Sequence, residues 1–279
     1  MSTHVAIIGL GLIGGSMARA LAPHAPIKAV EINPATLKKA SELGIDAPKD
    51  LKSAVAAADL VVIATPLGAF EAVFKQVAAN LKDGAIVVDM GSVKHTAVTL
   101  GKRFFPEGAF VGGHPMAGKE STGLEASDAE LFKGKTFILT PTTDAEREAA
   151  ERVKEILAPL DMEWIEMAPD THDLAVAFTS HMPLLMAAAT ARIAQGAIRE
   201  VPELPKLAAS GFRDTTRLAM TNPILGRDIC SQNKEAILHA IAAMRYQLTQ
   251  IEIMVQAETS TAIEMMFEGV GKWRQELKL

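Results

Sequence analysis

The chain has 279 residues, of which 28 are Lys or Arg and 33 are Asp or Glu, so its formal net charge is −5. Hydrophobic residues make up 49% and charged residues 22%, a globular composition that excludes a disordered chain, a collagen-like repeat and a strongly basic nucleic-acid binder. This length predicts two domains, each with its own core. The single cysteine, Cys230, excludes an internal disulfide framework and fits a reducing compartment, so we expect a cytoplasmic protein.

Two apolar runs invite comparison with a signal peptide or a membrane span. The run 5–17 lacks a basic segment before it and is interrupted by glycines, so it predicts a buried strand and turn. The run 174–191 is rich in alanine and contains His181 and Pro183, which argues against a membrane span. We therefore expect a soluble protein that binds neither membrane nor nucleic acid.

Short β-branched runs alternate with helical stretches from residue 4 to about 165, the pattern of a parallel sheet covered by helices. The runs are apolar nearly throughout, as strands buried on both faces must be, and we expect all seven in one doubly wound sheet. They are 4–10, 27–32, 59–66, 85–92, 109–115, 135–141 and 162–167. The segment Thr143-Asp-Ala-Glu146 has the form of a capping box and predicts a helix through Leu157.

Beyond Pro169 the strand pattern stops and helix-forming residues dominate, so we expect an α/β domain over 1–168 and an all-helical domain over 169–279. Residues 227–268 contain no Gly or Pro and predict a long helix, with 259–261 as the expected point of any break. Apolar residues within it follow a 4-3-4-3-4 spacing: Ile237, Ile241, Met244, Leu248, Ile251 and Val255. This spacing indicates a seam between helices, and we expect a homodimer; the alternative is that the stripe faces its own domain core.

The segment Gly9-Leu10-Gly11-Leu12-Ile13-Gly14 matches G-x-G-x-x-G between a predicted strand and a predicted helix. In this context the pattern predicts dinucleotide binding by Gly9, Gly11, Leu12, Ile13 and Gly14. Gly9 allows a tight turn, Gly11 lets the backbone approach a diphosphate, and Gly14 allows close packing of helix on strand. The helix N-terminus then favours the anion.

The residue at the end of the second predicted strand is Glu31, 20 positions after Gly11. Its carboxylate would accept hydrogen bonds from an adenosine ribose and repel a 2′-phosphate, so we expect NAD to be preferred over NADP. Lys38 and Lys39 fall inside the next helix and offer no phosphate clamp. The alternative is a glycine turn that binds no ligand.

Three polar clusters follow predicted strands, where ligands bind to a doubly wound sheet: Thr65-Pro66, Gly91–Lys94 and His114–Gly118. His114 has the pKa range to accept a proton from an alcohol as a hydride leaves, and Ser92 could share that hydrogen bond. The alternatives are that His114 bonds backbone in a turn and that Lys94 is a solvated lysine at a helix start.

In the helical region His172 and His181 are nine residues apart, half a turn out of phase on a regular helix, so His181 beside Pro183 is the better site candidate. Arg213 and Arg217 are four apart and can present two cations to a carboxylate; the alternative is surface pairing with Asp214 and Glu203. The seven histidines lack metal-binding spacings, so we expect no metal site.

Five segments taken together resemble the prephenate/arogenate dehydrogenase family of tyrosine biosynthesis. They are Gly9–Ser16, Gly91–Lys94, Gly112–Gly118, Ser180–Pro183 and Ser210–Arg217. The resemblance implies a Rossmann-type N-terminal domain, a helical C-terminal dimerisation domain, and oxidative decarboxylation of a cyclohexadienol substrate with NAD or NADP.

The resemblance also implies roles for individual residues. His114 is the catalytic acceptor at the ring hydroxyl, with Ser92 beside it; His181 is a substrate-binding residue, Arg217 the ligand of the ring carboxylate and Arg213 its basic companion. Some prephenate-using members have a second histidine where this chain has Leu184, which favours arogenate or both substrates.

Two other functions remain as alternatives. A β-hydroxyacid or imino-acid dehydrogenase has a similar two-domain plan but relies on a lysine in the helical domain. A non-catalytic NAD-sensing dimer would bind NAD without reducing it.

Overall fold

The computed structural model describes residues 3–47, 50–119 and 121–277. The chain separates into two compact units, the first ending at Lys234 and the second beginning at Glu235. The first unit holds every strand of the described chain and the helices as far as α11, whereas the second consists of α12 and α13.

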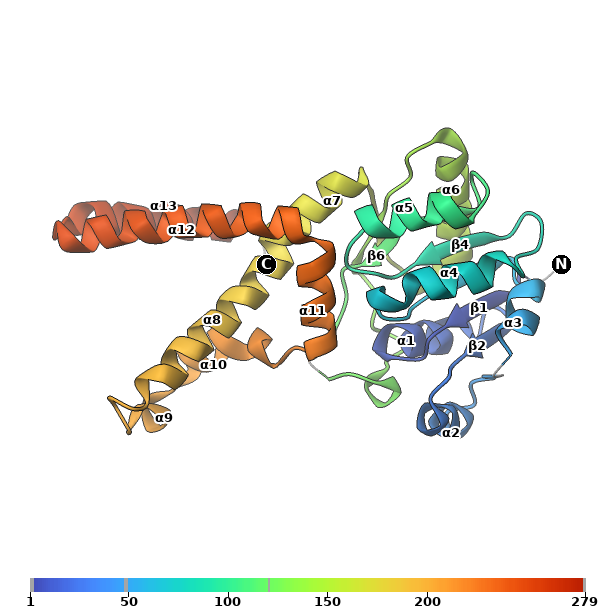
Figure 1. Cartoon of the computed structure of the whole chain (residues 1–279), viewed down its shortest axis with the longest axis horizontal. Helices are drawn as coiled ribbons and strands as arrows, with labels where there is room; N and C mark the ends of the chain where they lie inside the picture. The colour runs from blue at the N-terminus through green and yellow to red at the C-terminus, as the bar shows by residue number, and fades with distance from the viewer. Residues whose placement is uncertain (1–2, 48–49, 120, 278–279) are drawn as a thin grey trace. The chain divides into compact units, whose positions relative to one another are not determined.

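A five-stranded parallel sheet forms the centre of the first unit (Figure 1). Its strands are β1 (Val5–Ile8), β2 (Ile27–Val30), β3 (Leu60–Ile63), β4 (Ile86–Asp89) and β5 (Phe110–Val111). The order β2-β1-β3-β4-β5 reverses direction between β1 and β3. Ligands of open α/β sheets bind at such a reversal, outside the carboxyl ends of the strands. The loops after β1 and β3 are therefore the expected site.

Two hydrophobic clusters cover the two faces of this sheet, as the apolar runs predict. Ile7, Val62 and Val88 face α1 and α6, whereas Ile8, Ile63 and Val87 face α3, α4 and α5. Neighbouring residues of one strand enter opposite clusters because side chains alternate along a strand. The helices are α1 (Leu12–Leu21), α2 (Pro34–Glu42), α3 (Leu51–Ala57), η1 (Leu67–Ala69), α4 (Phe70–Ala78), α5 (His95–Phe104), η2 (Leu124–Ala126), α6 (Asp144–Leu157) and η3 (Ala158–Leu160).

The prediction of one seven-stranded sheet is wrong, because the run 109–115 divides into β5 and a separate strand β6 (Gly113–Pro115). β6 pairs antiparallel with β7 (Thr136–Leu139), which pairs parallel with β8 (Glu163–Glu166) in a second, three-stranded sheet. The division needs glycine: a Cβ at Gly113 would lie 2.7 Å from the Asp89 carbonyl oxygen. β8 is also not buried on both faces, since Ile165 is 44% exposed.

The predicted capping box is present at the start of α6. The Glu146 N–H donates to Thr143 Oγ1 (3.2 Å), and the Glu146 carboxylate accepts from the backbone N–H and the hydroxyl of Thr142. The return bond thus reaches Thr142 rather than the capping residue itself. The helix ends at Leu157, as predicted.

The helical region begins with a continuous helix that contains one π-helical turn. It runs through α7 (Pro169–Val176), one π-helical turn, η4 (Ala177–His181), and α8 (Met182–Ala197). Within the described residues, Pro169–Ala197 is one stretch that length and composition alone would allow to cross a membrane, but His172, Asp173 and His181 are buried along it. The remaining elements are α9 (Leu204–Leu207), α10 (Ser210–Thr216), η5 (Arg217–Met220) and α11 (Pro223–Gln232).

The long helix predicted for 227–268 is interrupted twice. α11 ends at Gln232, and Asn233 separates it from α12 (Lys234–Gln256). α13 (Ser260–Glu276) follows a short connection in which Glu258 has φ +51°. That left-handed residue stops the helix just before the predicted break point.

Candidate active site

The glycine loop after β1 has the geometry that its sequence predicts. Gly9 has φ +97°, a conformation that favours glycine, and a Cβ at Gly14 would lie only 2.0 Å from the Gly9 carbonyl oxygen. A Cβ at Gly11, by contrast, would meet no atom within 4 Å. Gly9 and Gly14 are thus required by the fold, whereas the open space at Gly11 is free for a ligand. Leu12 and Ile13 form the first turn of α1 behind it.

Glu31 is fixed by the backbone around it. Its Oε1 accepts from the N–H groups of Ile32 (2.7 Å) and Asn33 (2.8 Å), and its Oε2 accepts from the Leu10 N–H (3.0 Å). The last bond ties the carboxylate to the glycine loop itself. Glu31 therefore holds a negative charge at a defined position beside this loop.

Two hydroxyl groups at the ends of neighbouring strands are buried without a hydrogen-bond partner in the described structure: Thr65 Oγ1 after β3 and Ser92 Oγ after β4. Buried hydroxyls are normally hydrogen-bonded, because desolvating them costs about 1–3 kcal/mol. Thr65 and Pro66 lie at the switch point opposite the glycine loop, since a Cβ on Gly9 would touch Thr65. The open Gly11 and these unsatisfied hydroxyls fit a bound dinucleotide and its substrate.

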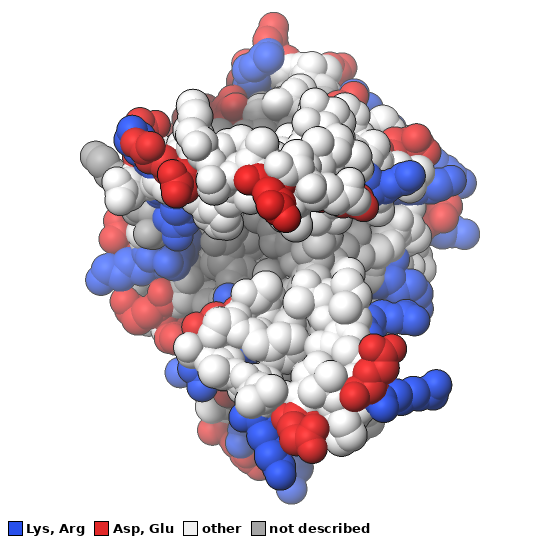
Figure 2. Space-filling view, turned by 90° about the vertical axis from the view of Figure 1, so that its left-hand side faces the viewer, with Lys and Arg blue, Asp and Glu red and all other residues white. Residues whose placement is uncertain are grey.

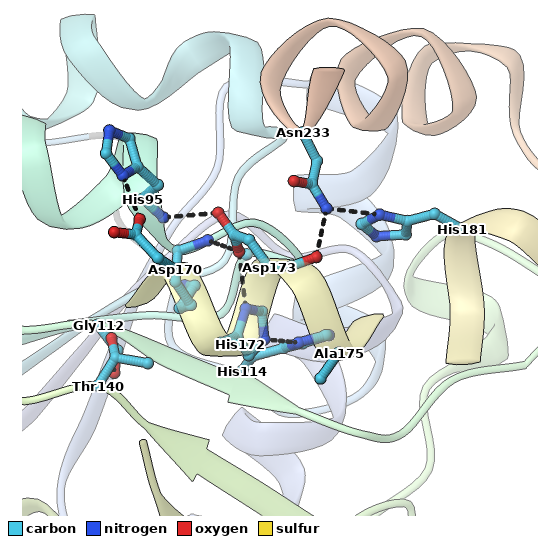
Figure 3. A network of polar contacts seen from close by, with 12 residues as sticks. His95, Gly112, His114, Thr140, Asp170, His172, Asp173, Ala175, His181 and Asn233 are labelled. Carbon is cyan, nitrogen blue, oxygen red and sulfur yellow. Dashed lines mark hydrogen bonds and ion pairs between the residues drawn. The ribbon is translucent and has the colours of Figure 1, made fainter. Parts of the chain in front are cut away.

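His114, on β6, heads a chain of buried hydrogen bonds (Figure 3). Its Nδ1 lies 2.8 Å from Nε2 of His172, and the two rings meet edge to face at 71°. Nδ1 of His172 lies 2.7 Å from Oδ1 of Asp173. His172 is fully buried, whereas His114 is partly exposed. The His114 ring is therefore the end of the chain that can meet a ligand.

Asp173 also anchors the start of α5. Its Oδ1 accepts from the Lys94 N–H (2.7 Å) and its Oδ2 from the His95 N–H (2.9 Å). Burial favours the neutral acid, but the hydrogen bonds from His172, Lys94 and His95 outweigh it and hold the pKa of Asp173 below its usual value. The carboxylate at the end of the chain is therefore ionised at neutral pH.

The interpretation of Lys94 as a solvated lysine is wrong. Its side chain is fully buried, forms an ion pair with Asp89 and donates to the Gly113 carbonyl oxygen (2.6 Å). Asp89 in turn accepts from the N–H groups of Gly91 (2.8 Å) and Gly113 (3.2 Å). Burial lowers the pKa of Lys94 and raises that of Asp89, while the pairing opposes both shifts. The pair fixes the backbone directly before His114.

The helix-phase argument that favoured His181 over His172 is also wrong, because the π-helical turn η4 lies between them and a π-turn shifts the phase. Both residues are buried in this region, and only His172 contacts His114 in the hydrogen bonds described. His181 Nδ1 lies 3.0 Å from the side-chain nitrogen of Asn233, which also donates to the Asp173 carbonyl oxygen (2.8 Å).

Burial keeps two of these histidines neutral. It lowers the pKa of His181 to about 4, and it lowers the pKa of His114 well below 6.5. The positive charge of Lys94, and those of His172 and His181 when they are protonated, lower the pKa of His114 further. A neutral histidine at neutral pH can accept a proton.

Arg213 and Arg217 occupy exposed positions, one near the end of α10 and the other at the first residue of η5. The expected regular helix through both is wrong, because it tightens into a 3-10 turn at Arg217. Arg213 lies 3.5 Å from the carboxylate of Asp214, with both side chains more than 70% exposed (77% and 73%). This is the surface pairing given above as the alternative. The roles of both arginines in substrate binding stay predictions.

Sequence reasoning did not identify Asp89, His172, Asp173 and Asn233 as site residues. The one available signal is the adjacent His172-Asp173 pair, a polar pair at the start of an apolar helix. Such a pair is costly to bury unless its groups are hydrogen-bonded.

A glycine loop at the switch point of a parallel sheet, together with a neutral histidine held by buried partners beside the end of β4, is the arrangement of a nucleotide-dependent dehydrogenase. Comparison with known proteins specifies the family. The pattern described as "prephenate dehydrogenase, nucleotide-binding domain" matches residues 15–166, and "prephenate dehydrogenase, dimerization domain" matches residues 168–269. The chain belongs to the prephenate dehydrogenase family.

Three relatives illustrate the similarity. Prephenate dehydrogenase of Bacillus subtilis is 31% identical over 100% of this chain and 77% of its own length. The crystal structure of A. aeolicus prephenate dehydrogenase, in complex with hydroxyphenyl propionate and NAD+, has a TM-score of 0.90 at 30% identity and covers 99% of both chains. That of Synechocystis arogenate dehydrogenase has a TM-score of 0.84 at 28% identity and covers 99% of this chain and 100% of its own.

Proposed function

We propose that this protein catalyses the oxidative decarboxylation of a cyclohexadienol, arogenate or prephenate or both, with hydride transfer to NAD. The observation that carries the proposal is His114: a partly exposed, neutral imidazole held by buried hydrogen bonds near the edge where the glycine loop lies. Family membership supports the reaction class, and the relatives named above include both a prephenate and an arogenate dehydrogenase.

The chemistry assigns His114 one task. As the hydride leaves C4 of the ring, the C4 hydroxyl becomes a ketone and its proton passes to His114. The resulting vinylogous β-keto acid loses carbon dioxide, and the ring becomes aromatic when the oxygen recovers the proton. Ser92, whose hydroxyl is buried and unpaired in the described structure, would donate or accept at the same oxygen.

The cofactor would be held by Gly9, Gly11, Leu12, Ile13 and Gly14 at the start of α1, with Thr65 and Pro66 opposite. When bound, NAD would supply the hydride acceptor. We infer that NAD is preferred over NADP because the Glu31 carboxylate is fixed by three backbone N–H groups and would face a 2′-phosphate as a like charge.

The substrate would meet His181, Arg213 and Arg217 from the helical region. Because the pKa of His181 is about 4, this residue would act as a neutral hydrogen-bond donor rather than as a cation. The positive charge for the substrate carboxylates would then come from the arginines. Leu184 occupies the position of a second histidine in some prephenate-using relatives, which supports arogenate or dual use.

The two alternatives explain less of the site. A β-hydroxyacid or imino-acid dehydrogenase would need a lysine from the helical domain, whereas among the described residues the buried lysine is Lys94, from the sheet domain. A non-catalytic NAD sensor would not require the hydrogen bonds that link His114, His172 and Asp173.

The direct test is a spectrophotometric assay of NADH or NADPH formation with arogenate and prephenate, each offered with NAD and NADP. We expect turnover with NAD and at least one substrate, and weaker turnover with NADP. The absence of turnover in all four pairings would contradict the proposal.

We further propose that the domain boundary lies at 168/169, that the protein is cytoplasmic, and that it forms a homodimer through the helical domain. Large apolar side chains on α12 and α13 are exposed in the single chain, among them Val255 (60%) and Phe267 (69%). Figure 2 shows extensive uncharged surface on the face toward the viewer. Exposed apolar area of this kind is typical of a protein interface.

The homodimer is tested by placing charges in the seam. Ile241→Asp combined with Leu248→Asp should dissociate the dimer or unfold the helical domain, since buried unpaired charges are costly. Ala242→Asp with Thr249→Asp has the same spacing on exposed neighbouring positions and should leave the assembly intact. Light scattering gives the mass; a wild-type value near 29.7 kDa, that of one chain, would exclude the dimer.

A further inference from the structure

The hydrogen bonds that link Asp173, His172 and His114 have a defined donor-to-acceptor direction, which follows from the ionised carboxylate of Asp173. Both oxygens of Asp173 accept backbone N–H groups at the start of α5, and its pKa lies below the usual value. An ionised carboxylate only accepts. The nitrogen of His172 that faces it at 2.7 Å, Nδ1, must therefore carry a hydrogen.

The next bond follows from the first. A neutral imidazole has one N–H and one unprotonated nitrogen, so His172 with a hydrogen on Nδ1 presents Nε2 as an acceptor. Nδ1 of His114 lies 2.8 Å from this Nε2, and must be the donor. His114 is then left with an unprotonated Nε2.

We propose that His172 is a positioning residue that, together with Asp173, fixes the tautomer of His114 and so makes its Nε2 the proton acceptor of the reaction. The inference rests on the proposed function for its catalytic consequence, but the tautomer itself does not depend on the substrate. Both ring nitrogens of His172 bond protein groups, Nδ1 to Asp173 and Nε2 to His114, so this buried residue would touch no ligand. Its effect on the reaction passes through His114.

The donor-to-acceptor direction of these hydrogen bonds depends on whether His172 carries one hydrogen or two. A proton on His172 Nε2 would make that nitrogen a donor to His114 Nδ1, and His114 would then carry its hydrogen on Nε2 and lose its acceptor. The groups that act on His114 are His172 from α7, Lys94 next to α5 and His181 from η4. Asp173 and Asp89 are the carboxylates paired with His172 and Lys94. The direction of these hydrogen bonds therefore depends on Asp173 holding a single hydrogen on His172, at Nδ1.

Two substitutions that differ by one methylene separate this role from a structural one. In His172→Gln the amide can reach the position of Nε2, accept from His114 and hold its tautomer. In His172→Asn the amide reaches only the position of Nδ1, so it can bond Asp173 but not His114. We expect the Gln variant to keep kcat within about fivefold of the wild type and the Asn variant to lose about 10- to 100-fold, by analogy with positioning partners of general bases.

The controls are the affinity for NAD and the thermal midpoint, which should be similar in the two variants. Equal kcat values for the Gln and Asn variants, both folded, would overturn the proposal.

A measurement on the wild type alone keeps the inference testable if a variant does not fold. The ¹⁵N chemical shifts of imidazole nitrogens distinguish protonated from unprotonated nitrogen, with the His114 signals assigned by their loss in His114→Asn. We expect His114 to be protonated on Nδ1 and unprotonated on Nε2 at pH 7.5. A hydrogen on Nε2 would overturn the proposal. If the wild type shows no turnover in the four-way assay, the proposed function fails, while this spectrum still decides the tautomer.

Discussion

The cofactor half and the catalytic half of the candidate site are built in different ways. The cofactor half centres on one local segment, Gly9–Gly14, anchored by Glu31 through the Leu10 N–H. It works through backbone groups and through the absence of side chains. The catalytic half consists of side chains far apart in the sequence, since His114 and His172 are separated by 58 residues. A substitution should therefore damage the two halves by different mechanisms, by steric exclusion in one and by a lost proton acceptor in the other.

The substitution His114→Asn should distinguish the catalytic half from the cofactor half most clearly. It should lower kcat by about 10²- to 10⁴-fold, because the proton acceptor is lost, and leave the dissociation constant of NAD nearly unchanged. Steady-state kinetics and a fluorescence titration with NAD measure the two quantities. The control is His24→Asn, at an exposed position just after α1, which should change neither quantity. A His114→Asn enzyme with near-normal kcat would assign the proton acceptor to another group, and His181 would be tested next.

Two alanine substitutions should separate the glycines needed for the fold from the glycine that leaves room for the ligand. In Gly14→Ala the new Cβ would lie 2.0 Å from the Gly9 carbonyl oxygen, so the thermal midpoint should fall by several degrees and NAD binding should weaken about 10- to 100-fold. In Gly11→Ala the Cβ meets no protein atom within 4 Å, so the midpoint should stay near that of the wild type while NAD binding weakens. Equal loss of stability in both variants would show that Gly11 is structural.

The cofactor preference should depend on the charge of Glu31. Glu31→Ala removes the like charge opposite a 2′-phosphate, so the ratio of kcat/KM with NADP to that with NAD should rise about tenfold or more. Glu42→Ala, in the following helix, removes an exposed carboxylate and serves as the control. A wild-type enzyme that uses NADP more efficiently than NAD would contradict this role of Glu31.

The smallest expected effect is the pH dependence. Because the pKa of His114 lies well below 6.5, the neutral, active form persists and kcat should stay level as the pH falls through 6.5, declining only at lower pH. The free energy of unfolding changes over a different pH range. The unfolded chain protonates its histidines near 6.5 while folded His181 stays neutral to about 4, so stability should fall as the pH drops from 6.5 toward 4. A rate that halves near pH 6.5 would contradict the first of these two expectations.

The sequence by itself determines the local features of this protein. The five strands of the parallel sheet, the glycine loop, the cap of α6 at Thr143 and the helical nature of the second half all follow from patterns that span fewer than about ten residues. Such patterns are readable because strand and helix periodicity, capping and left-handed glycine conformations depend on neighbours along the chain. For the same reason Ser92 could be placed after the end of a strand, whereas His114 lies within β6 of the second sheet.

Only the tertiary structure decided which of these side chains meet. The sheet divides after Val111 because Gly113 packs against the Asp89 carbonyl, Lys94 is buried because Asp89 lies opposite it, and a π-turn brings His172 and His181 into one region. Asp173 reaches the N–H of Lys94 across 79 residues of sequence. No local pattern encodes these pairings, because burial makes each polar group depend on a partner that the chain supplies from elsewhere.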